Sequence, residues 1–272
     1  MGVFRSAAGT ELHYELRGDG PLLVCQPGGP GRPAGYLDDL GGLSRTRTLL
    51  LLDQRGTGLS DPAPSHVFTE LADDLERLRL DLGADHLDLL GHSAGAWTVL
   101  AYAAKHPSRV SRLVLLTPSR IPIPMGADEP NQDVLVKRWF AAEPWYPAAK
   151  ASWDKDNGDD DADRGFMPLV YGADTPAVRE HAQRPESANN YTDFWSDTLD
   201  PGDLAAVGVP VTIIAGDRDI VTGLAAPHVL ADWLPNAQII WLPDAGHFPW
   251  VTSPARTRDA IEAALSRPTP HD

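Results

Sequence analysis

The segment that most constrains this chain is LLGHSAGAW, which covers Leu89–Trp97. An apolar run precedes Gly91 and an alanine-rich run follows Gly95, so Ser93 falls where a strand is predicted to pass into a helix. A G-x-S-x-G pattern in that position is typical of a tight turn that strains the serine backbone and presents its hydroxyl at the carboxyl edge of a sheet. The segment therefore predicts a parallel α/β sheet with Ser93 as a nucleophile. The alternative interpretation is an ordinary glycine-containing turn, in which Ser93 would not be a nucleophile.

The apolar pattern predicts the rest of the sheet. Six short runs without polar alternation are typical of strands that are buried on both faces. These runs are 22–25, 48–52, 87–90, 113–116, 211–215 and 239–242. Segments of helical period lie between several of them, and residues 3–16 contain two alternating stretches that predict a hairpin at an antiparallel edge. We therefore expect a mostly parallel, eight-stranded α/β sheet with helices on both faces.

The alternation of strands and helices stops between residues 119 and 203. This segment is rich in Pro, Asp, Ala and Trp, and it contains four of the eight tryptophans in the chain. A chain of 272 residues is long enough for one large domain with an insertion. We predict a core made of residues 1–118 and 204–272, and an inserted helical cap made of residues 119–203.

A catalytic serine needs a base to take its proton and a third group to orient that base. Among the nine histidines, His247 follows the last apolar run in the glycine-containing loop of IIWLPDAGHFPW, which is expected to reach the same sheet edge as Ser93. His92 adjoins Ser93, but neighbouring side chains on such a turn point apart, so we expect a structural role for it. The segment VTIIAGDRDI offers Asp219 as the orienting acid, with Asp217 as the alternative. Serine, aspartate and histidine then follow the chain order expected of this architecture.

The loop QPGGPGRPAG, after the predicted strand at 22–25, is the candidate source of an oxyanion hole. Two backbone N–H groups must point at the negative charge that develops on a carbonyl oxygen, and losing one donor typically costs about 3 kcal/mol. Ala94 directly follows the serine and supplies the first N–H. The loop glycines permit close backbone approach, and the Gly29 N–H is our candidate for the second.

With these residues placed, the chain resembles the α/β-hydrolase superfamily over nearly its whole length. A finer likeness to the proline iminopeptidase-like branch is carried by GGPG at Gly28–Gly31 and by DQRGTGLSD at Asp53–Asp61. The segments GDRD and AGH match the acid and base segments of the superfamily. The resemblance implies the α/β-hydrolase fold and a capped serine hydrolase that needs neither a cofactor nor a metal. Peptidases of that branch release an N-terminal residue and hold its free ammonium with carboxylates.

Departures from that branch bear on the substrate. Pro27 stands where the loop usually has histidine, and Ala94 stands where peptidase members commonly have a bulkier aromatic residue. An ammonium pocket would need carboxylates from the cap. Glu143 lies in WFAAEPWYP, where Trp139 and Trp145 are expected to form an apolar wall around it. Asp193 and Glu186 are equally open candidates for that carboxylate, and Trp195 is a further candidate substrate contact.

We therefore expect a serine hydrolase that acts on an ester or an amide through an acyl-enzyme. Release of an N-terminal residue from small peptides or amides is included in that expectation. Carboxylesterases, C–C hydrolases, lyases and cofactor-free perhydrolases use the same triad and stay open, because fold and triad do not fix the substrate. The expected partner is a small molecule or a short peptide. A non-catalytic binding protein of this fold would normally have lost the serine or the histidine.

Composition argues against several other classes. The formal net charge of −15 disfavours a nucleic-acid partner, because phosphate binding needs a basic face. The sequence has no run of about 18 apolar residues that could span a membrane, and its first residues lack the pattern of a signal peptide. Cys25 is the single cysteine and excludes an intramolecular disulfide, which is compatible with the cytoplasm, the expected location. The sequence does not indicate an oligomeric state.

The two glycine-containing loops near the first strands admit further interpretations. Gly29–Ala34 imitates the G-x-G-x-x-A fingerprint of dinucleotide-binding proteins, with Asp53 at the end of the next strand. Pro30 and Pro33 remove backbone donors that should bind a pyrophosphate, so we do not expect a dinucleotide. Arg55, in DQRG, is expected to pair with cap or loop carboxylates and to brace the entrance of the site.

Overall fold

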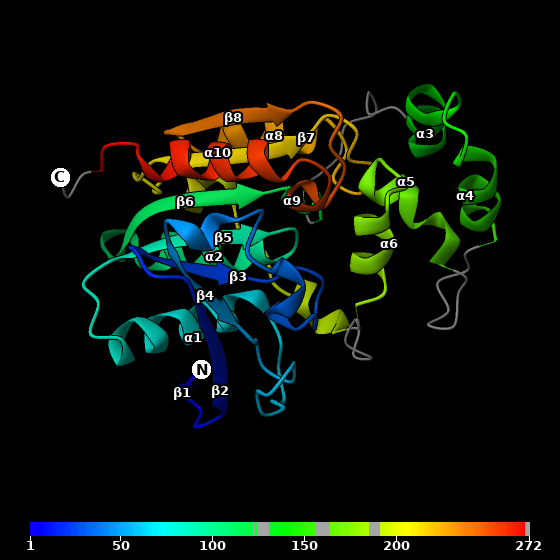
Figure 1. The fold of residues 1–272 in the computed structure, drawn as a ribbon. Coiled ribbons are helices and arrows are strands. Elements are labelled where there is room, and N and C mark those ends of the chain that lie inside the picture. The colour runs from blue at the N-terminus through cyan, green and yellow to red at the C-terminus, as the bar shows by residue number, and fades with distance from the viewer. Residues whose placement is uncertain (122, 124–130, 156–163, 185–190, 270–272) are drawn as a thin grey trace.

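The computed structural model describes residues 1–121, 123, 131–155, 164–184 and 191–269, and these contain one eight-stranded sheet (Figure 1). The strands lie in the spatial order β1-β2-β4-β3-β5-β6-β7-β8. Their bounds are β1 Gly2–Arg5, β2 Glu11–Arg17, β3 Leu22–Gln26, β4 Thr48–Leu52, β5 Leu87–His92, β6 Val110–Leu116, β7 Val211–Gly216 and β8 Ala237–Leu242.

Strand direction divides the sheet into two parts. β2 pairs antiparallel with both β1 and β4, whereas the remaining neighbours pair in parallel. The predicted hairpin at the antiparallel edge and the mostly parallel, eight-stranded α/β-hydrolase sheet are thereby confirmed. The carboxyl ends of the parallel strands meet at one edge, so the loops that follow β3, β5, β6, β7 and β8 converge there.

Helices cover both faces of the sheet. Side chains of α1 (Phe68–Asp81), α2 (Gly95–Lys105) and α8 (Ala226–Trp233) belong to one buried apolar cluster, and those of α9 (Pro249–Thr252) and α10 (Pro254–Leu265) belong to another. Along β3, Val24 packs into the first cluster and Leu23 and Cys25 into the second. Strand side chains alternate between faces, so a sheet covered on both sides needs continuous apolar strands. The 3-10 helices are η1 Ala34–Leu37, η2 Leu43–Arg45, η3 Pro107–Arg109, η4 Arg164–Phe166 and η5 Thr192–Trp195.

The chain between β6 and β7 is helical wherever the structure describes regular elements. Its α-helices are α3 Gln132–Phe140, α4 Tyr146–Trp153, α5 Met167–Tyr171, α6 Pro176–Ala182 and α7 Pro201–Leu204. Figure 1 shows α3–α6 beyond the carboxyl ends of β6, β7 and β8, and α5 and α6 contact α9 of the core. The boundaries of the cap at residues 119 and 203 stay a prediction. In the described part of the chain, every helix is too short or too polar to cross a membrane.

Candidate active site

Ser93 occupies the tight turn between β5 and α2. Its φ angle is +51°, which lies in the left-handed region that non-glycine residues rarely adopt. The Ser93 N–H donates to the Leu116 carbonyl at 3.0 Å, and the Ser93 carbonyl accepts from the Ser119 N–H at 3.0 Å. Backbone hydrogen bonds to the end of β6 thus hold the strained turn in place. None of the described residues, His247 included, is hydrogen-bonded to the Ser93 hydroxyl.

Two glycines permit the crowded backbone around Ser93. A Cβ atom on Gly95 would lie 2.3 Å from the Pro27 carbonyl oxygen, which is closer than real contacts allow. A Cβ atom on Gly28 would lie 2.7 Å from Ser93 Cβ. The loop after β3 is therefore packed directly against the turn that carries the serine. This close approach explains why the sequence has glycine, not alanine, at these two positions.

His247 and Asp219 lie together under this edge of the sheet. His247 Nδ1 is 2.9 Å from Asp219 Oδ2, and the two residues are only 5% and 1% exposed. The carboxylate also accepts hydrogen bonds from the N–H groups of Val221 at 2.8 Å and Thr222 at 3.0 Å. Burial alone would raise the pKa of Asp219, but the His247 ring and the Thr222 donors hold it below its usual value. An ionised Asp219 fixes the proton of His247 on Nδ1 and leaves Nε2 as the base.

Asp217, the alternative acid, faces a different partner. Its Oδ1 accepts a hydrogen bond from the Asp244 N–H at 2.7 Å, which ties the turn after β7 to the turn after β8. Of the two aspartates in GDRD, the structure therefore places Asp219, and not Asp217, against His247.

His92 is hydrogen-bonded inside the protein at both ring nitrogens. Its Nε2 donates to the His247 carbonyl at 3.2 Å, and its Nδ1 accepts from the Tyr36 hydroxyl at 2.6 Å. Burial, together with the repulsion that a protonated His247 would exert, puts the pKa of His92 well below its ordinary value, so the His92 ring is neutral. The Tyr36 hydroxyl in turn accepts from the Gly28 N–H at 2.7 Å. One chain of hydrogen bonds thus joins the loop after β3 to the backbone of His247.

These hydrogen bonds determine which loop N–H groups remain available for the candidate oxyanion hole. The Gly28 N–H is already donated to Tyr36, so it does not point at a substrate. The Gly29 N–H and the Ala94 N–H have no acceptor among the described residues. Gly29 has a φ of +58°, and Gln54 Nε2 donates to its carbonyl at 3.5 Å. The two predicted donors therefore lie on the loop and the turn that pack against each other, with their hydrogens available.

The cap residues predicted to bind substrate do not form one group. Trp139 and Trp145 both pack on Phe140, with ring centroids 6.1 Å and 5.3 Å away, and Glu143 lies half-buried on the turn between them. Trp195 packs against the apolar cluster on the opposite face of the sheet. The Asp193 carboxylate accepts a hydrogen bond from the His66 N–H at 2.8 Å. Glu186, the last candidate, lies outside the described residues.

The expected role of Arg55 is corrected by its partners. Arg55 is buried and binds the Asp74 carboxylate through two hydrogen bonds, of 2.6 Å and 3.0 Å, and it binds Glu70 at 3.0 Å. Both acids lie on α1 of the core, not on the cap or a loop, because the loop after β4 folds back over that helix. Asp53 is likewise used internally, since it accepts from the N–H groups of Ala34 at 2.9 Å and Leu59 at 3.1 Å.

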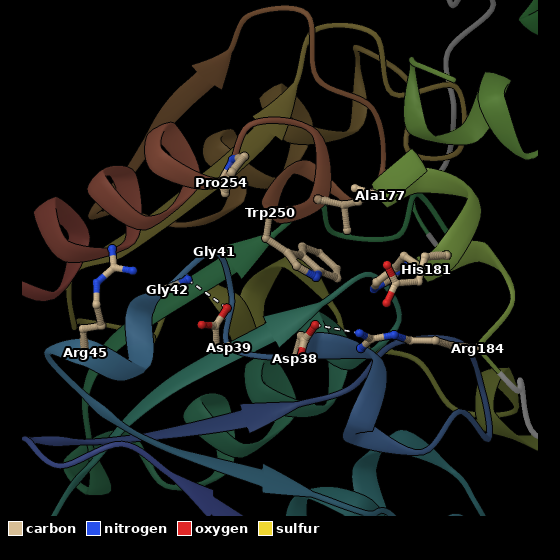
Figure 2. Close-up of a pocket in the computed structure, with 12 residues that line it drawn as sticks. Asp38, Asp39, Gly41, Gly42, Arg45, Ala177, His181, Arg184, Trp250 and Pro254 are labelled. Carbon is tan, nitrogen blue, oxygen red and sulfur yellow. Dashed lines mark hydrogen bonds and ion pairs between the residues drawn. The ribbon is translucent and has the colours of Figure 1, made fainter. Parts of the chain in front are cut away.

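Figure 2 shows a cavity of about 320 Å³ between α6, α9 and the segment that joins η1 to η2. Trp250 and His181 form part of its wall, as do Asp38 and Arg184, which pair with each other at 2.7 Å. None of the residues that line it belongs to the Ser93, Asp219 and His247 group. No group of His, Cys, Asp and Glu suited to a metal ion occurs in the described parts of the chain.

Comparisons with known proteins agree with this architecture. Residues 21–145 match the family model described as alpha/beta hydrolase fold. The chain is 28% identical over 261 residues to a protein named as the carbamate hydrolase RutD of Pseudomonas savastanoi pv. phaseolicola, covering 90% of this chain and 93% of the relative. It is 28% identical over 263 residues to the 2-(acetamidomethylene)succinate hydrolase of Mesorhizobium japonicum, covering 92% and 90%. An esterase from Exiguobacterium antarcticum superposes with a TM-score of 0.74 over 98% of this chain and 100% of that chain, at 19% identity.

The chain thus has the α/β-hydrolase fold, and its sequence is similar to proteins that are named as hydrolases. The likeness to the esterase concerns the fold, because the identity is only 19%. The two relatives carry the names of a carbamate hydrolase and an acetamido-compound hydrolase, not of peptidases. The finer resemblance to the proline iminopeptidase-like branch is not shown and stays a prediction.

Proposed function

We propose that this protein is a serine hydrolase that cleaves ester, amide or carbamate bonds in small molecules. The observation that carries the proposal is the buried pair of His247 and Asp219, 2.9 Å apart, together with a serine held at a φ of +51° on the turn whose His92 bonds to the His247 carbonyl. A histidine oriented by an ionised carboxylate is the base that a serine hydroxyl needs at neutral pH. The names of the two relatives favour acyl compounds with a nitrogen leaving group.

The proposed reaction begins when Ser93 Oγ attacks the carbonyl carbon of the substrate and His247 Nε2 takes its proton. The Gly29 and Ala94 N–H groups donate to the oxygen that becomes negative. Asp219 stabilises the imidazolium that forms but does not take its proton. His247 then protonates the leaving alcohol or amine. Water hydrolyses the acyl-enzyme by the same route, with His247 first as base and then as acid.

The cap argues for small acyl compounds over peptides. A peptidase that releases N-terminal residues would need a carboxylate held at the site to bind the substrate ammonium. The Glu143 carboxylate is half-exposed and has no hydrogen-bond partner among the described residues, and Asp193 is engaged by the His66 backbone. Glu143 is therefore not held in place, and Asp193 is held by a bond to His66, so neither supports a preformed site for a substrate ammonium.

A paired substrate panel tests the proposal. Purified protein is assayed with p-nitrophenyl acetate, p-nitroacetanilide, and the p-nitroanilides of proline and alanine. We expect turnover of the acetyl compounds, slower turnover of the amino-acid anilides, and loss of activity in Ser93→Ala with the circular dichroism spectrum unchanged. Retention of more than about a tenth of the activity by Ser93→Ala would overturn the proposal, because loss of a triad serine costs far more than that.

A further inference from the structure

Thr117 follows the last residue of β6 and is completely buried. Each of its polar groups is bonded to a different loop or strand. Its N–H donates to the Ile214 carbonyl of β7 at 2.7 Å, and its hydroxyl donates to the His247 carbonyl at 3.0 Å. Its carbonyl accepts from the Thr222 hydroxyl at 3.3 Å. Thr117 therefore joins the histidine loop to the aspartate loop.

The backbone of Thr117 is strained. Its φ is +41°, in the left-handed region, where a β-branched side chain is a clear outlier. Such a conformation costs on the order of 1–3 kcal/mol and persists only where the surroundings impose it. Here the three hydrogen bonds impose it. Strain of this kind is concentrated at functional sites, and Thr117 lies directly beneath one.

The residues beside Thr117 hold the nucleophile. Leu116 accepts from the Ser93 N–H, and Ser119 donates to the Ser93 carbonyl, each at 3.0 Å. The short segment after β6 thus contacts the backbone or the loop of all three proposed triad residues. The chain reaches this arrangement because β6 lies between β5, which carries the serine, and β7, which leads to the aspartate.

The His247 backbone is held from three sides. Its N–H donates to the Val170 carbonyl of cap helix α5 at 2.9 Å. Its carbonyl accepts from the Thr117 hydroxyl and from His92 Nε2. His92 belongs to the same turn as Ser93, so it ties the histidine to the nucleophile, whereas Thr117 ties the histidine to the acid. Removing the Thr117 hydroxyl would leave the carbonyl with His92 alone.

We propose that Thr117 is a positioning residue that sets His247 between Ser93 and Asp219 through its hydroxyl. This inference rests on the proposed function. The hydroxyl does not touch the substrate or the reacting atoms, so its loss should lower the rate of proton transfer without weakening substrate binding. A shift of the imidazole by about 1 Å is enough to lower kcat by about 10- to 100-fold.

The test compares three substitutions at this position. Thr117→Val keeps the shape and removes the hydroxyl, Thr117→Ala removes the hydroxyl and the branch, and Thr117→Ser keeps the hydroxyl. We measure kcat and KM with p-nitrophenyl acetate and the rate at which a fluorophosphonate labels Ser93, well below the lowest melting temperature of the set. We expect kcat and labelling to fall about 10- to 100-fold in the first two variants, with KM nearly unchanged and with Thr117→Ser close to wild type.

Thr98→Val is the matched control. Thr98 is also a completely buried threonine, on α2, and its hydroxyl has no hydrogen-bond partner among the described residues. The same chemical change there should leave kcat and labelling at wild-type values. If Thr117→Val fails to fold, Thr117→Ala gives the same comparison.

The outcomes separate the two proposals. Wild-type rates in Thr117→Val or Thr117→Ala would overturn the positioning role, as would a loss in Thr117→Ser equal to that in Thr117→Val. The proposed function would survive either result, provided that Ser93 is labelled in the wild type. Absence of labelling in the wild type would instead overturn the proposed function itself.

Discussion

The sheet edge that carries Ser93 and the cap that lies beyond it are built differently. Ser93, Asp219 and His247 are each at most 9% exposed, and hydrogen bonds join the loops that carry them. In the cap, Glu143 and the tryptophans on either side of it are only half-buried. The difference teaches that the proposed catalytic residues are held on rigid strand ends, whereas the predicted substrate contacts lie on an insertion. Substitutions at the sheet edge should therefore alter kcat and the free energy of unfolding, whereas substitutions in the cap should alter substrate preference.

The largest expected effect is the loss of the orienting acid. Asp219→Asn keeps the shape of the side chain but favours the wrong tautomer of His247, so we expect kcat to fall by about 10⁴-fold. Asp217→Asn is the matched control from the same turn and should stay near the wild-type kcat, because Asp217 bonds to the Asp244 backbone. Steady-state kinetics on p-nitrophenyl acetate provide the measurement. Equal losses in both variants would contradict the distinction between the two aspartates.

The second prediction compares glycines of the two regions. Gly95→Ala would press a methyl group against the Pro27 carbonyl at 2.3 Å, so we expect a loss of about 1–3 kcal/mol in the free energy of unfolding. Gly202→Ala, in α7, meets no atom within 4 Å and has no positive φ, so we expect a gain of about 0.4–1 kcal/mol. Urea unfolding of both variants provides the measurement. A Gly95→Ala protein as stable as wild type would mean that the turn is not tightly packed.

The third prediction concerns pH and the contact between cap and core. His181 of α6 donates through Nε2 to the Tyr36 carbonyl at 2.7 Å and accepts through Nδ1 from the Tyr171 hydroxyl at 2.6 Å. Burial lowers the pKa of His181 to about 4, against about 6.5 in an unfolded chain. Between these values the unfolded state binds more protons, so stability should fall as the pH drops from about 6.5 towards 4.

Urea unfolding at several pH values across that range checks this expectation. The neutral, buried His92 contributes in the same direction, whereas the lowered pKa of Asp219 acts only below its unfolded value. His181→Gln should reduce the slope of stability against pH but not remove it. A slope identical to that of the wild type would show that His181 is free to take a proton in the folded state.

The smallest expected effect lies in the cap. Because no described residue holds the half-exposed Glu143 carboxylate in place, Glu143→Gln should leave KM for alanine p-nitroanilide and for neutral p-nitrophenyl acetate within about two-fold of wild type. Steady-state kinetics with both substrates provide the measurement. A rise of about five-fold or more in KM for the anilide alone would contradict this expectation and show that Glu143 binds the substrate ammonium.

The sequence was sufficient to predict the fold and to single out Ser93 and His247. It also limited the orienting acid to Asp219 or, as the alternative, Asp217. These residues lie in short segments at strand ends, where local pattern and chain order carry the information. The selection of Asp219 over Asp217 depends on how one loop turns, and only the structure places one of them at 2.9 Å from His247.

Other features depend on contacts between distant segments. Tyr36 bonds to His92, and the two are 56 positions apart in the sequence, without any local signal that pairs them. Thr117 looks like an ordinary residue after a strand, and the role proposed for it follows from the order β5-β6-β7 in the sheet. Arg55 was expected to face the cap, but the fold of its loop brings it to α1. In the cap, short helices without strong periodicity do not predict which side chains face the substrate.

The measurement that tests the central claim most directly is the labelling of the protein by a fluorophosphonate, with the adduct mapped by mass spectrometry. The account predicts a single adduct on the peptide that contains Ser93, no adduct in Ser93→Ala, and labelling slowed at least about 100-fold in His247→Gln, because the base is then absent. An adduct on another residue, or a His247→Gln protein labelled at the wild-type rate, would contradict the claim that these side chains act as one proton-transfer chain.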